Sequence, residues 1–380
     1  MGSYKYFKRS KSGKVNTLLN KKLQSVEWGE FNLEKLFGKA TRGKRLKSFD
    51  RNSGALPFVT AGEANEGISA LIGNDITVFS ENTITIDMFG SAKYRNYKYG
   101  GDDHISVIHT ENLKKFASIF VTSAIHKSSY TGEFNYGRNF YPKDADELNI
   151  SLPIKNGKID FEFMESFIAE LEVARISKLK IYLLASGLND YTLTNEEKKV
   201  LNDFNSSKFE LEEFQIDTLF SVSPSKTYKM NDIDILAENG KTPYVSNQSQ
   251  SNGYIGRSNL PPLNPSNVIT LSDTWQSERT IFYQPTEFIG KSHLQVMKSF
   301  DKRFKKLELF FVISSFRKAI TELNYDYGTK FNRTKINATK IQLPTKNNQP
   351  DYKLMETLIS AIQKIVIKDV VLYVEKKLDD

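Results

Sequence analysis

The chain has 380 residues, 39% of them hydrophobic and 26% charged, with a formal net charge of +8 and no cysteine. The length favours two or three domains, and no stretch approaches the ~18 consecutive apolar residues of a membrane span. The lack of cysteine excludes disulfides, thiolate metal sites and a cysteine nucleophile, and with no visible secretory signal we expect a cytoplasmic protein without membrane contact.

Residues 1–26 form a basic N-terminal extension with seven Lys or Arg residues and no acidic residue. This composition is typical of a mobile, solvated segment, which we favour over a specific DNA-binding arm. The rest of the chain is nearly neutral, so affinity for a polyanion would depend on local clusters. Two such clusters run from Lys39 to Lys47 and from Lys291 to Lys346, the second with thirteen basic residues against four acidic ones.

The first globular unit, residues 27–157, begins at Trp28 and consists mainly of short extended segments separated by turn residues, as at Asn65 to Gly67. A helix is predicted over residues 113–123, followed by the loop FNYGRNFYPKD and a short strand, NISLPI.

A long helix is predicted next, within residues 158–187, with Gly187 as its stop signal. Its apolar residues recur at three- and four-residue steps, the pattern of a helix that buries one face. Residues 188–208 form a connector in which a short helix begins at Thr194, with Glu197 in its first turn. The apolar stripe of the long helix includes Phe161, Met164, Ile168 and Leu171.

The same order of segments returns in residues 209–349, followed by a second long helix at residues 350–380. Matching residues stand 191 positions apart, for example Phe120 with Phe311 and Met164 with Met355. We interpret the chain as a tandem duplication, in the α+β class, of a mixed α/β unit plus a long helix. Each apolar stripe needs a partner, and the other stripe is the obvious one. The second stripe contains Met355, Ile359, Ile362 and Val366.

Motifs for catalysis are weak in this sequence. The segment FIGKS from Phe288 to Ser292 ends like a phosphate-binding loop, but the first glycine of that motif would fall at Pro285. The four histidines show no metal-binding spacing, so we expect no metal site, and Asn259 with the residues LPPL after it is better read as a turn. The pattern argues against catalysis by this chain alone.

The order of segments resembles the specificity subunit of type I restriction-modification systems, and the specificity subunits of type IIB systems are similar. Each half opens with a segment such as EFNLEKLF or EFQIDTLF. There follow P-[FY]-V, an asparagine-glycine turn, an ITI or ITL strand with a tip loop, a [YF]-x-Y-G-x-x-F loop, a short LP strand and the long helix. The likeness covers nearly the whole chain from Trp28 onward and lies in the order and duplication.

The resemblance implies two target-recognition domains that each read one half of a bipartite, asymmetric DNA site. It also implies that the long helices form an antiparallel coiled coil with pseudo-twofold symmetry and dock two methyltransferase subunits, with restriction subunits as possible further partners. A helix of about 28 residues is ~42 Å long, comparable with one turn of B-DNA at about 34 to 36 Å. The chain itself would bind no cofactor, and S-adenosylmethionine is expected on the methyltransferase.

DNA contacts are expected from the tips that differ between the halves, because these carry donors suited to base edges and phosphates. The predicted residues of the first half are Thr60, Glu63, Ser91, Lys93, Tyr94, Arg95, Arg138, Asn139 and Lys143. Those of the second half are Ser246, Asn247, Gln248, Trp275, Gln276, Arg279, Lys330, Asn332, Arg333 and Lys335.

Two other interpretations stay open at this point. The chain could be a nuclease or modification enzyme in its own right, or an adaptor between proteins that does not touch DNA. The DNA sequence, the spacer between half-sites and the type of restriction system do not follow from the sequence.

Overall fold

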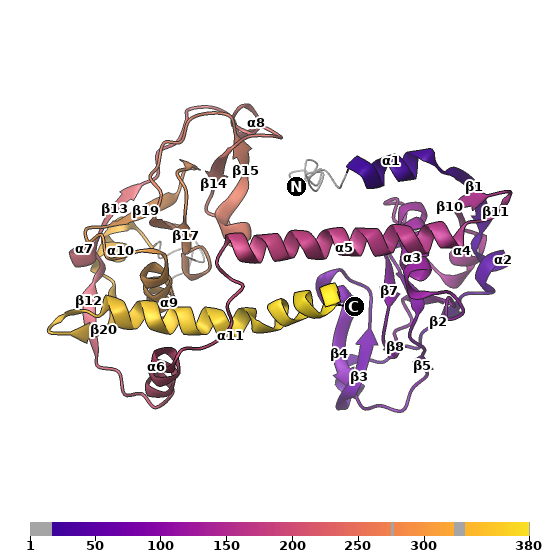
Figure 1. Cartoon of the computed structure of the whole chain (residues 1–380), viewed down its shortest axis with the longest axis horizontal. Helices are drawn as coiled ribbons and strands as arrows, with labels where there is room; N and C mark the ends of the chain where they lie inside the picture. Colours follow the sequence, from indigo (N-terminus) through magenta and orange to yellow (C-terminus); the bar gives the residue numbers. More distant parts are fainter. Residues whose placement is uncertain (1–16, 275–276, 323–330, 380) are drawn as a thin grey trace. The chain divides into compact units, whose positions relative to one another are not determined.

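The computed structural model describes residues 17–274, 277–322 and 331–379. The chain divides into two compact units, Met1–Leu179 with Lys377–Asp380, and Lys180–Lys376. Figure 1 shows that the first unit combines small sheets with α3 and α5, and the second repeats this combination with α9 and α11. None of the helices in the described ranges is long and apolar enough to cross a lipid bilayer.

The first unit contains three small sheets, with strand orders β1-β10-β11, β2-β9-β6-β7 and β4-β3-β8-β5. Its longest pairing joins β1 to β10, where Gly29 faces Leu152 in an antiparallel register. The strands are β1 (Glu27–Asn32), β2 (Thr41–Arg42), β3 (Ser53–Val59), β4 (Ile68–Ile72), β5 (Val78–Phe79), β6 (Thr83–Asp87), β7 (Ala92–Arg95), β8 (Tyr99–Gly101), β9 (Ile105–Ile108), β10 (Asn149–Lys155) and β11 (Lys158–Ile159).

Helix α3 (Lys115–Ser129) covers the first unit's core. It begins two residues later and ends six residues later than the sequence predicts, because Ile125 and Ser129 are both buried and the Ser129 hydroxyl donates a 2.6 Å hydrogen bond to the Gly90 carbonyl. Packing therefore extends a helix that the apolar pattern alone would end at Ser123. The other helices before the long one are α2 (Leu33–Phe37) and α4 (Pro142–Glu147).

The second unit repeats these sheets, which confirms the duplication at the level of topology. The order β13-β19-β16-β17 matches β2-β9-β6-β7, and β12-β20-β21 matches β1-β10-β11. A third sheet has the order β15-β14-β18. The elements are β12 (Leu211–Gln215), α7 (Ile216–Leu219), β13 (Phe220–Pro224), α8 (Asp232–Ile235), β14 (Thr242–Val245), β15 (Tyr254–Ser258), β16 (Val268–Ser272), β17 (Phe282–Gln284), β18 (Ile289–Gly290), β19 (Leu294–Ser299), α9 (Lys306–Glu322), α10 (Arg333–Ala338), β20 (Lys340–Lys346) and β21 (Gln349–Pro350).

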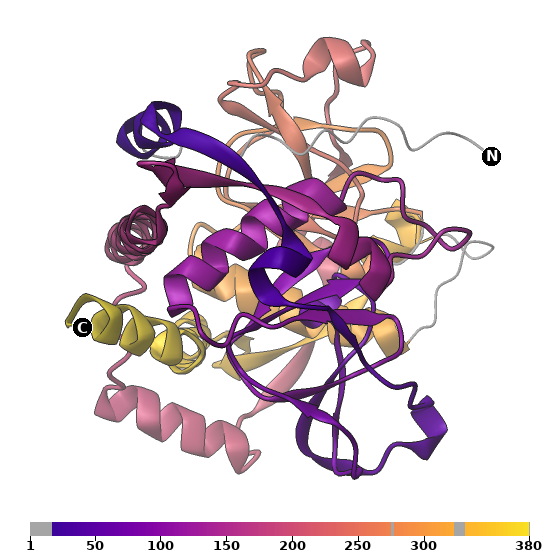
Figure 2. The same ribbon diagram turned by 90° about the vertical axis from the view of Figure 1, so that its right-hand side faces the viewer.

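The N-terminal part of the chain contains a helix, α1 (Thr17–Ser25), so the expectation of a mobile extension is wrong for residues 17–25. Leu19 is 2% exposed in the first core. Lys22 Nζ lies 2.6 Å from Glu170 Oε2 on the long helix, and α1 can be followed beside α5 in Figures 1 and 2. A nine-residue helix is unstable alone, so these contacts stabilise it.

Helix α6 (Asn195–Asn205) occupies the corresponding place before β12. It confirms the predicted start at Thr194: the Thr194 hydroxyl accepts from the Glu197 N–H, and the Glu197 carboxylate accepts from the Thr194 N–H. Glu197 also contacts Ser360 and Lys364 on the second long helix. Each repeat thus begins one helix earlier than the sequence comparison indicates.

The long helices are α5 (Phe161–Ala185) and α11 (Tyr352–Asp379). Gly187 has a left-handed backbone with φ of 68°, and the Leu188 N–H donates to the Leu183 carbonyl, which confirms the predicted stop. The C-terminal end of α11 belongs to the first unit, where Lys377 Nζ lies 3.0 Å from Glu172 Oε1, so α5 and α11 are in contact.

The stripe predicted on the long helices is buried only in part. Met164 and Met355 are both fully buried, and Ile168 is nearly so. Ile362 and Val366, by contrast, are 37% and 73% exposed. Ile359 and Ile362 line an apolar groove of about 410 Å³ with Phe204 of α6, the residues that follow α6, and side chains of β12, α9 and β20. The side chains that α11 buries within its length include Leu358, Ala361, Val371 and Val374.

Candidate nucleic-acid interface

Three loops meet at one end of the first unit. They are the β3–β4 turn at residues 60–67, the β6–β7 turn at residues 88–91, and the loop of residues 130–141 between α3 and α4. The Gly62 N–H donates to Asp87 Oδ2 at 3.3 Å, and the Phe140 N–H donates to the Met88 carbonyl at 2.9 Å. The structure therefore brings together the three tips that the sequence predicts to contact DNA.

A charged cluster lies where the first two of these loops meet. Lys93 Nζ is 2.9 Å from Ser91 Oγ, 3.2 Å from Glu63 Oε1 and 3.8 Å from Asp87 Oδ2. A hydrogen bond with Ser91 lowers the pKa of Glu63, and Lys93 adds to this effect against burial, which opposes it. The side chain of Glu63 is 62% exposed while that of Lys93 is 15% exposed. An ionised acceptor is thus held at the surface by a largely buried cation.

Arg95 lies in a different environment from the exposed tip that the sequence suggests. It is 1% exposed, and its guanidinium donates to Thr85 Oγ1, Tyr97 Oη and the Glu66 carbonyl, each at 2.9 Å. The prediction that Arg95 contacts a base directly is therefore wrong, because its guanidinium is buried and already bonded. Strand alternation is the reason, because Lys93 and Arg95 point to the same face of β7, under the 60–67 turn.

Tyr94 points to the opposite face of β7 and is half-buried. Its hydroxyl donates a 3.0 Å hydrogen bond to Asn82 Oδ1, and burial raises the pKa of Tyr94. Ser91 is 2% exposed, and Thr60 uses its N–H to close the turn on the Gly67 carbonyl. These three predicted residues build the tip, with little free surface of their own.

The loop between α3 and α4 presents an exposed cation. The Arg138 side chain is 56% exposed, pairs with Asp144, and lies 5.2 Å from the centre of the Phe134 ring. Lys143, on α4, is 83% exposed and stands 3.7 Å from Glu147. Asn139 is half-buried beside Tyr141, with 3.4 Å between Asn139 Nδ2 and the Tyr141 hydroxyl.

Tyr136 is a candidate that the sequence reasoning did not select. It is 85% exposed and meets Phe89 of the neighbouring turn edge-on, with ring centres 5.2 Å apart. An exposed ring at a tip suits stacking on a base or a sugar. The signal for it was the Tyr-Gly pair at Tyr136, which recurs at Tyr327. Tyr327 lies outside the described residues.

The corresponding turn of the second unit is neutral. Ser246 is buried, and its hydroxyl accepts from the Gln248 N–H. Gln248 Nε2 donates to the Tyr254 carbonyl at 2.7 Å, and Asn247 Nδ2 stands 3.5 Å from Thr274 Oγ1 of the β16–β17 tip. Predicted tips again meet, here through amides and hydroxyls.

Among the other predicted residues of the second unit, Arg279 is 66% exposed, with Glu278 3.6 Å away. Asn332 accepts from the Lys335 N–H at 3.1 Å and so caps α10, where Arg333 is exposed. Capping occupies the Oδ1 acceptor of Asn332, and the expected DNA contact of this exposed residue stays a prediction. Trp275, Gln276 and Lys330 lie outside the described residues.

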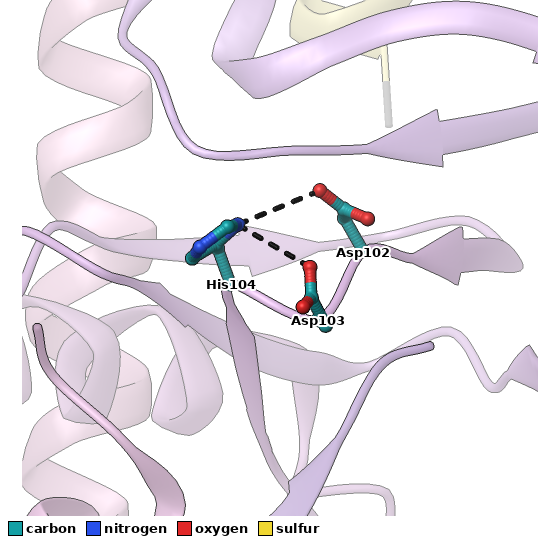
Figure 3. A group of neighbouring side chains, drawn as sticks. All are labelled: Asp102, Asp103 and His104. Atoms are coloured by element: carbon teal, nitrogen blue, oxygen red, sulfur yellow. Dashed lines mark ion pairs between the residues drawn. The ribbon is translucent and has the colours of Figure 1, made fainter. Parts of the chain in front are cut away.

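The turn between β8 and β9 holds two carboxylates and an imidazole close together (Figure 3). His104 Nδ1 is 3.7 Å from Asp102 Oδ2 and 3.3 Å from Asp103 Oδ1. Arg42 also approaches, with Nη2 4.0 Å from Asp103 Oδ2. The second unit has Lys291, Ser292 and His293 at this turn, so the repeat does not preserve the donor set. Arg42 and the His104 ring both lie beside Asp103, which favours a turn held by local polar contacts over a metal centre.

The fold and its tips define a class of protein: a duplicated α/β scaffold that presents two chemically different loop surfaces, each followed by a long helix. The model of the type I restriction modification DNA specificity domain matches residues 25–180 and 209–372, most of the chain. The chain belongs to this family of DNA specificity domains of type I restriction-modification systems.

Two similar proteins are instructive. The specificity subunit S.BcgI of a type II restriction enzyme from Heyndrickxia coagulans is 25% identical over 154 residues, which is 40% of this chain and 45% of that protein. The match therefore spans less than half the length of this relative. The crystal structure of a type I restriction-modification S subunit from M. genitalium is 13% identical, covers 93% of both chains and superposes with a TM-score of 0.60, which shows a common fold.

Proposed function

We propose that each repeat reads one half of a bipartite, asymmetric duplex DNA site. The observation that carries this proposal is that equivalent strands keep their register while the chemistry of their tips changes. Asp87 is the last residue of β6 and pairs with Ile105 on β9. Ser272 is the last residue of β16 and pairs with Leu294 on β19. A buried carboxylate in one half is thus a neutral hydroxyl in the other, which suits two different half-sites.

The same comparison holds one strand further. Lys93 pairs with Thr85 in the first unit, and Phe282 pairs with Thr270 in the second. One half therefore places a cation under its turn where the other places an aromatic ring. Because the framework is common and the tips are not, we infer that the framework positions the tips and the tips select the bases.

The target-recognition domains that we propose comprise residues 27–157 and 209–349, with residues 188–208 as connector. The residues best placed to contact DNA lie at the tips, are exposed or half-buried, and bear a charge, an amide or a ring. In the first unit they are Glu63, Tyr136, Arg138 and Lys143, and in the second they are Asn247, Gln248, Arg279 and Arg333.

The long helices, residues 158–187 and 350–380, would pair as an antiparallel coiled coil and fix the distance between half-sites. The contact of Lys377 with Glu172 supports this pairing. So does the division of the chain, because the last residues of α5 and of α11 each fall in the unit formed mainly by the other repeat.

The partners that we propose are two methyltransferase subunits, with restriction subunits joining the assembly on DNA. The apolar groove lined by Phe204, Ile359 and Ile362 is a suitable docking surface because its lining is mainly apolar and open to solvent. The chain would bind no cofactor, and S-adenosylmethionine would enter with the methyltransferase. A cytoplasmic location fits this assembly.

The test is a selection from random duplex DNA by the purified chain with its methyltransferase, followed by methylation assays with the chain alone. A two-part consensus with a fixed spacer, and no turnover without the methyltransferase, is the expected result. Turnover by the isolated chain would favour an enzyme, and failure to select any sequence would favour a protein–protein adaptor.

A further inference from the structure

Arg95 and Gln284 occupy equivalent positions at the ends of β7 and β17. Arg95 pairs with Thr83 on β6, and Gln284 pairs with Val268 on β16. Both side chains are 1% exposed. The chemistry differs, since one is a guanidinium and the other an amide, but both are hydrogen-bond donors in a place that water does not reach.

The two side chains make the same pair of contacts. Arg95 donates to Thr85 Oγ1 at 2.9 Å and to the Glu66 carbonyl at 2.9 Å. Gln284 Nε2 donates to Thr270 Oγ1 at 2.9 Å and to the Asn252 carbonyl at 3.3 Å. Each therefore ties a threonine in the middle of the neighbouring strand to the backbone of the turn above it.

Gln284 acts at this position as a hydrogen-bond donor. Its buried Oε1 accepts no hydrogen bond from any described residue, while Nε2 makes both contacts. In the first unit Arg95 adds a third bond, to the Tyr97 hydroxyl. A shared pattern of donation by two different residue types indicates a common role.

The turns that receive these bonds have a backbone that needs support. Asn65 and Glu66 have φ values of 47° and 53°, and Ser251 and Asn252 have φ values of 52° and 54°. Left-handed conformations at residues other than glycine are costly and persist where neighbouring contacts hold them. Both turns end in a glycine, Gly67 or Gly253, whose N-terminal neighbour carries the accepted bond.

The bonded turns are also those that carry predicted DNA contacts. The 60–67 turn contains Glu63, and the 246–253 turn contains Asn247 and Gln248. We propose that Arg95 and Gln284 are positioning residues for sequence recognition, each holding the reading turn of its own repeat in place from below. This inference rests on the proposed function, because it assumes that these turns face DNA.

The experiment uses the full chain with its methyltransferase and two duplex libraries, each randomised in one half-site. The variants are Arg95→Met and Gln284→Met, which remove the donors, and Arg95→Gln, which installs the residue of the sister repeat. We expect Arg95→Met to relax base preference in one half-site by about tenfold and Gln284→Met in the other. Arg95→Gln should retain most of the preference. Thermal unfolding of each variant is measured in parallel.

The wild-type chain separates the two proposals. If it selects no two-part sequence, the proposed function fails and this inference fails with it. If it does, then unchanged preference in Arg95→Met, or an equal loss in both half-sites that follows the drop in unfolding temperature, overturns the positioning role alone. If Arg95→Met does not fold, Arg95→Lys replaces it, because a lysine keeps the charge but cannot bridge Thr85, Tyr97 and Glu66 together, so the same half-site should relax.

Discussion

Lys364 on α11 forms an ion pair with Glu197 on α6, with 3.0 Å between Nζ and Oε2. Lys364 Nζ also lies 2.9 Å from Asp190 Oδ2, and Ser360 donates to the other Glu197 oxygen at 2.7 Å. In the first unit the signs are exchanged, because Lys22 lies on the leading helix α1 and Glu170 on the long helix α5. The repeats use opposite charges for the same attachment.

Lys364→Ala should lower the free energy of unfolding by about 2 kcal/mol, because it leaves Glu197, with a side chain 7% exposed, without its cation. Lys22→Ala is the matched control. Its pair with Glu170 is almost half exposed on both sides, so we expect a loss below about 1 kcal/mol. Urea denaturation measures both. Equal losses in the two variants would contradict the assigned difference in burial.

The contribution of this network should depend on pH. Burial raises the pKa of Glu197, but bonds from the Thr194 N–H, Ser360 and Lys364 outweigh it and hold the pKa below its usual value. A lowered carboxyl pKa stabilises the fold above the unfolded value of about 4.3, and this stabilisation is lost as the pH falls through the folded pKa. The difference in unfolding free energy between wild type and Lys364→Ala should therefore shrink between about pH 5 and pH 3. A difference that stays constant over this range would contradict the role of the ionised Glu197.

At alkaline pH the same pair behaves in the opposite direction. The bond to Asp190 and then that to Glu197 raise the pKa of Lys364. A raised lysine pKa stabilises the fold below the unfolded value of about 10.4, and the effect is lost as the pH rises through the folded pKa. The network is thus fully effective between about pH 5 and pH 10.

Arg279→Ala should relax base preference in the second unit's half-site and cost roughly 1 to 3 kcal/mol of binding to the preferred sequence. The reason is that the Arg279 side chain is 66% exposed at a tip, where its ion pair with Glu278 is long, at 3.6 Å. Lys340→Ala, an exposed residue on β20 paired with Glu213, serves as the control and should leave the preference unchanged. Uniform weakening on all sequences would make Arg279 a phosphate contact.

Ile362→Asp should weaken binding of the methyltransferase at least about tenfold, because it places a carboxylate in the apolar groove beside Phe204 and Ile359. Lys353→Ala, on an exposed position of the same helix, should leave that affinity unchanged. Sedimentation of the mixed proteins measures the assembly, with thermal unfolding to confirm that α6 still packs. Wild-type assembly by Ile362→Asp would exclude the groove as the docking surface.

The parts of the fold that the sequence predicts well are those that depend on local chemistry. Neighbouring residues are sufficient to predict the capping pair Thr194 and Glu197 and the helix stop at Gly187. The apolar spacing along the chain predicts the two long helices in the same way. The duplication follows from matching residues 191 positions apart, as at Met164 and Met355. These features need no knowledge of tertiary contacts.

The parts that sequence reasoning missed depend on distant contacts. Helix α1 is short and basic, and only its packing through Leu19 and Lys22 holds it. Arg95 looks like a surface cation in a tip, but strand alternation turns it inward, where Thr85 Oγ1 and the Glu66 carbonyl accept its hydrogen bonds. Tyr136 is a candidate because of its exposure and its contact with Phe89, and neither can be predicted from neighbouring residues.

The exchanged signs of the two helix attachments have a consequence for protein engineering. If α1 were seated on α11, Lys22 would face the position of Ala361, which matches Glu170 in the repeat, and if α6 were seated on α5, Glu197 would face the position of Val173, which matches Lys364. The loss of both ion pairs would therefore penalise a crossed assembly of the two repeats. Chimeras that exchange recognition domains should be joined in the segment between Gly187 and Thr194. This junction keeps α1 with α5 and α6 with α11.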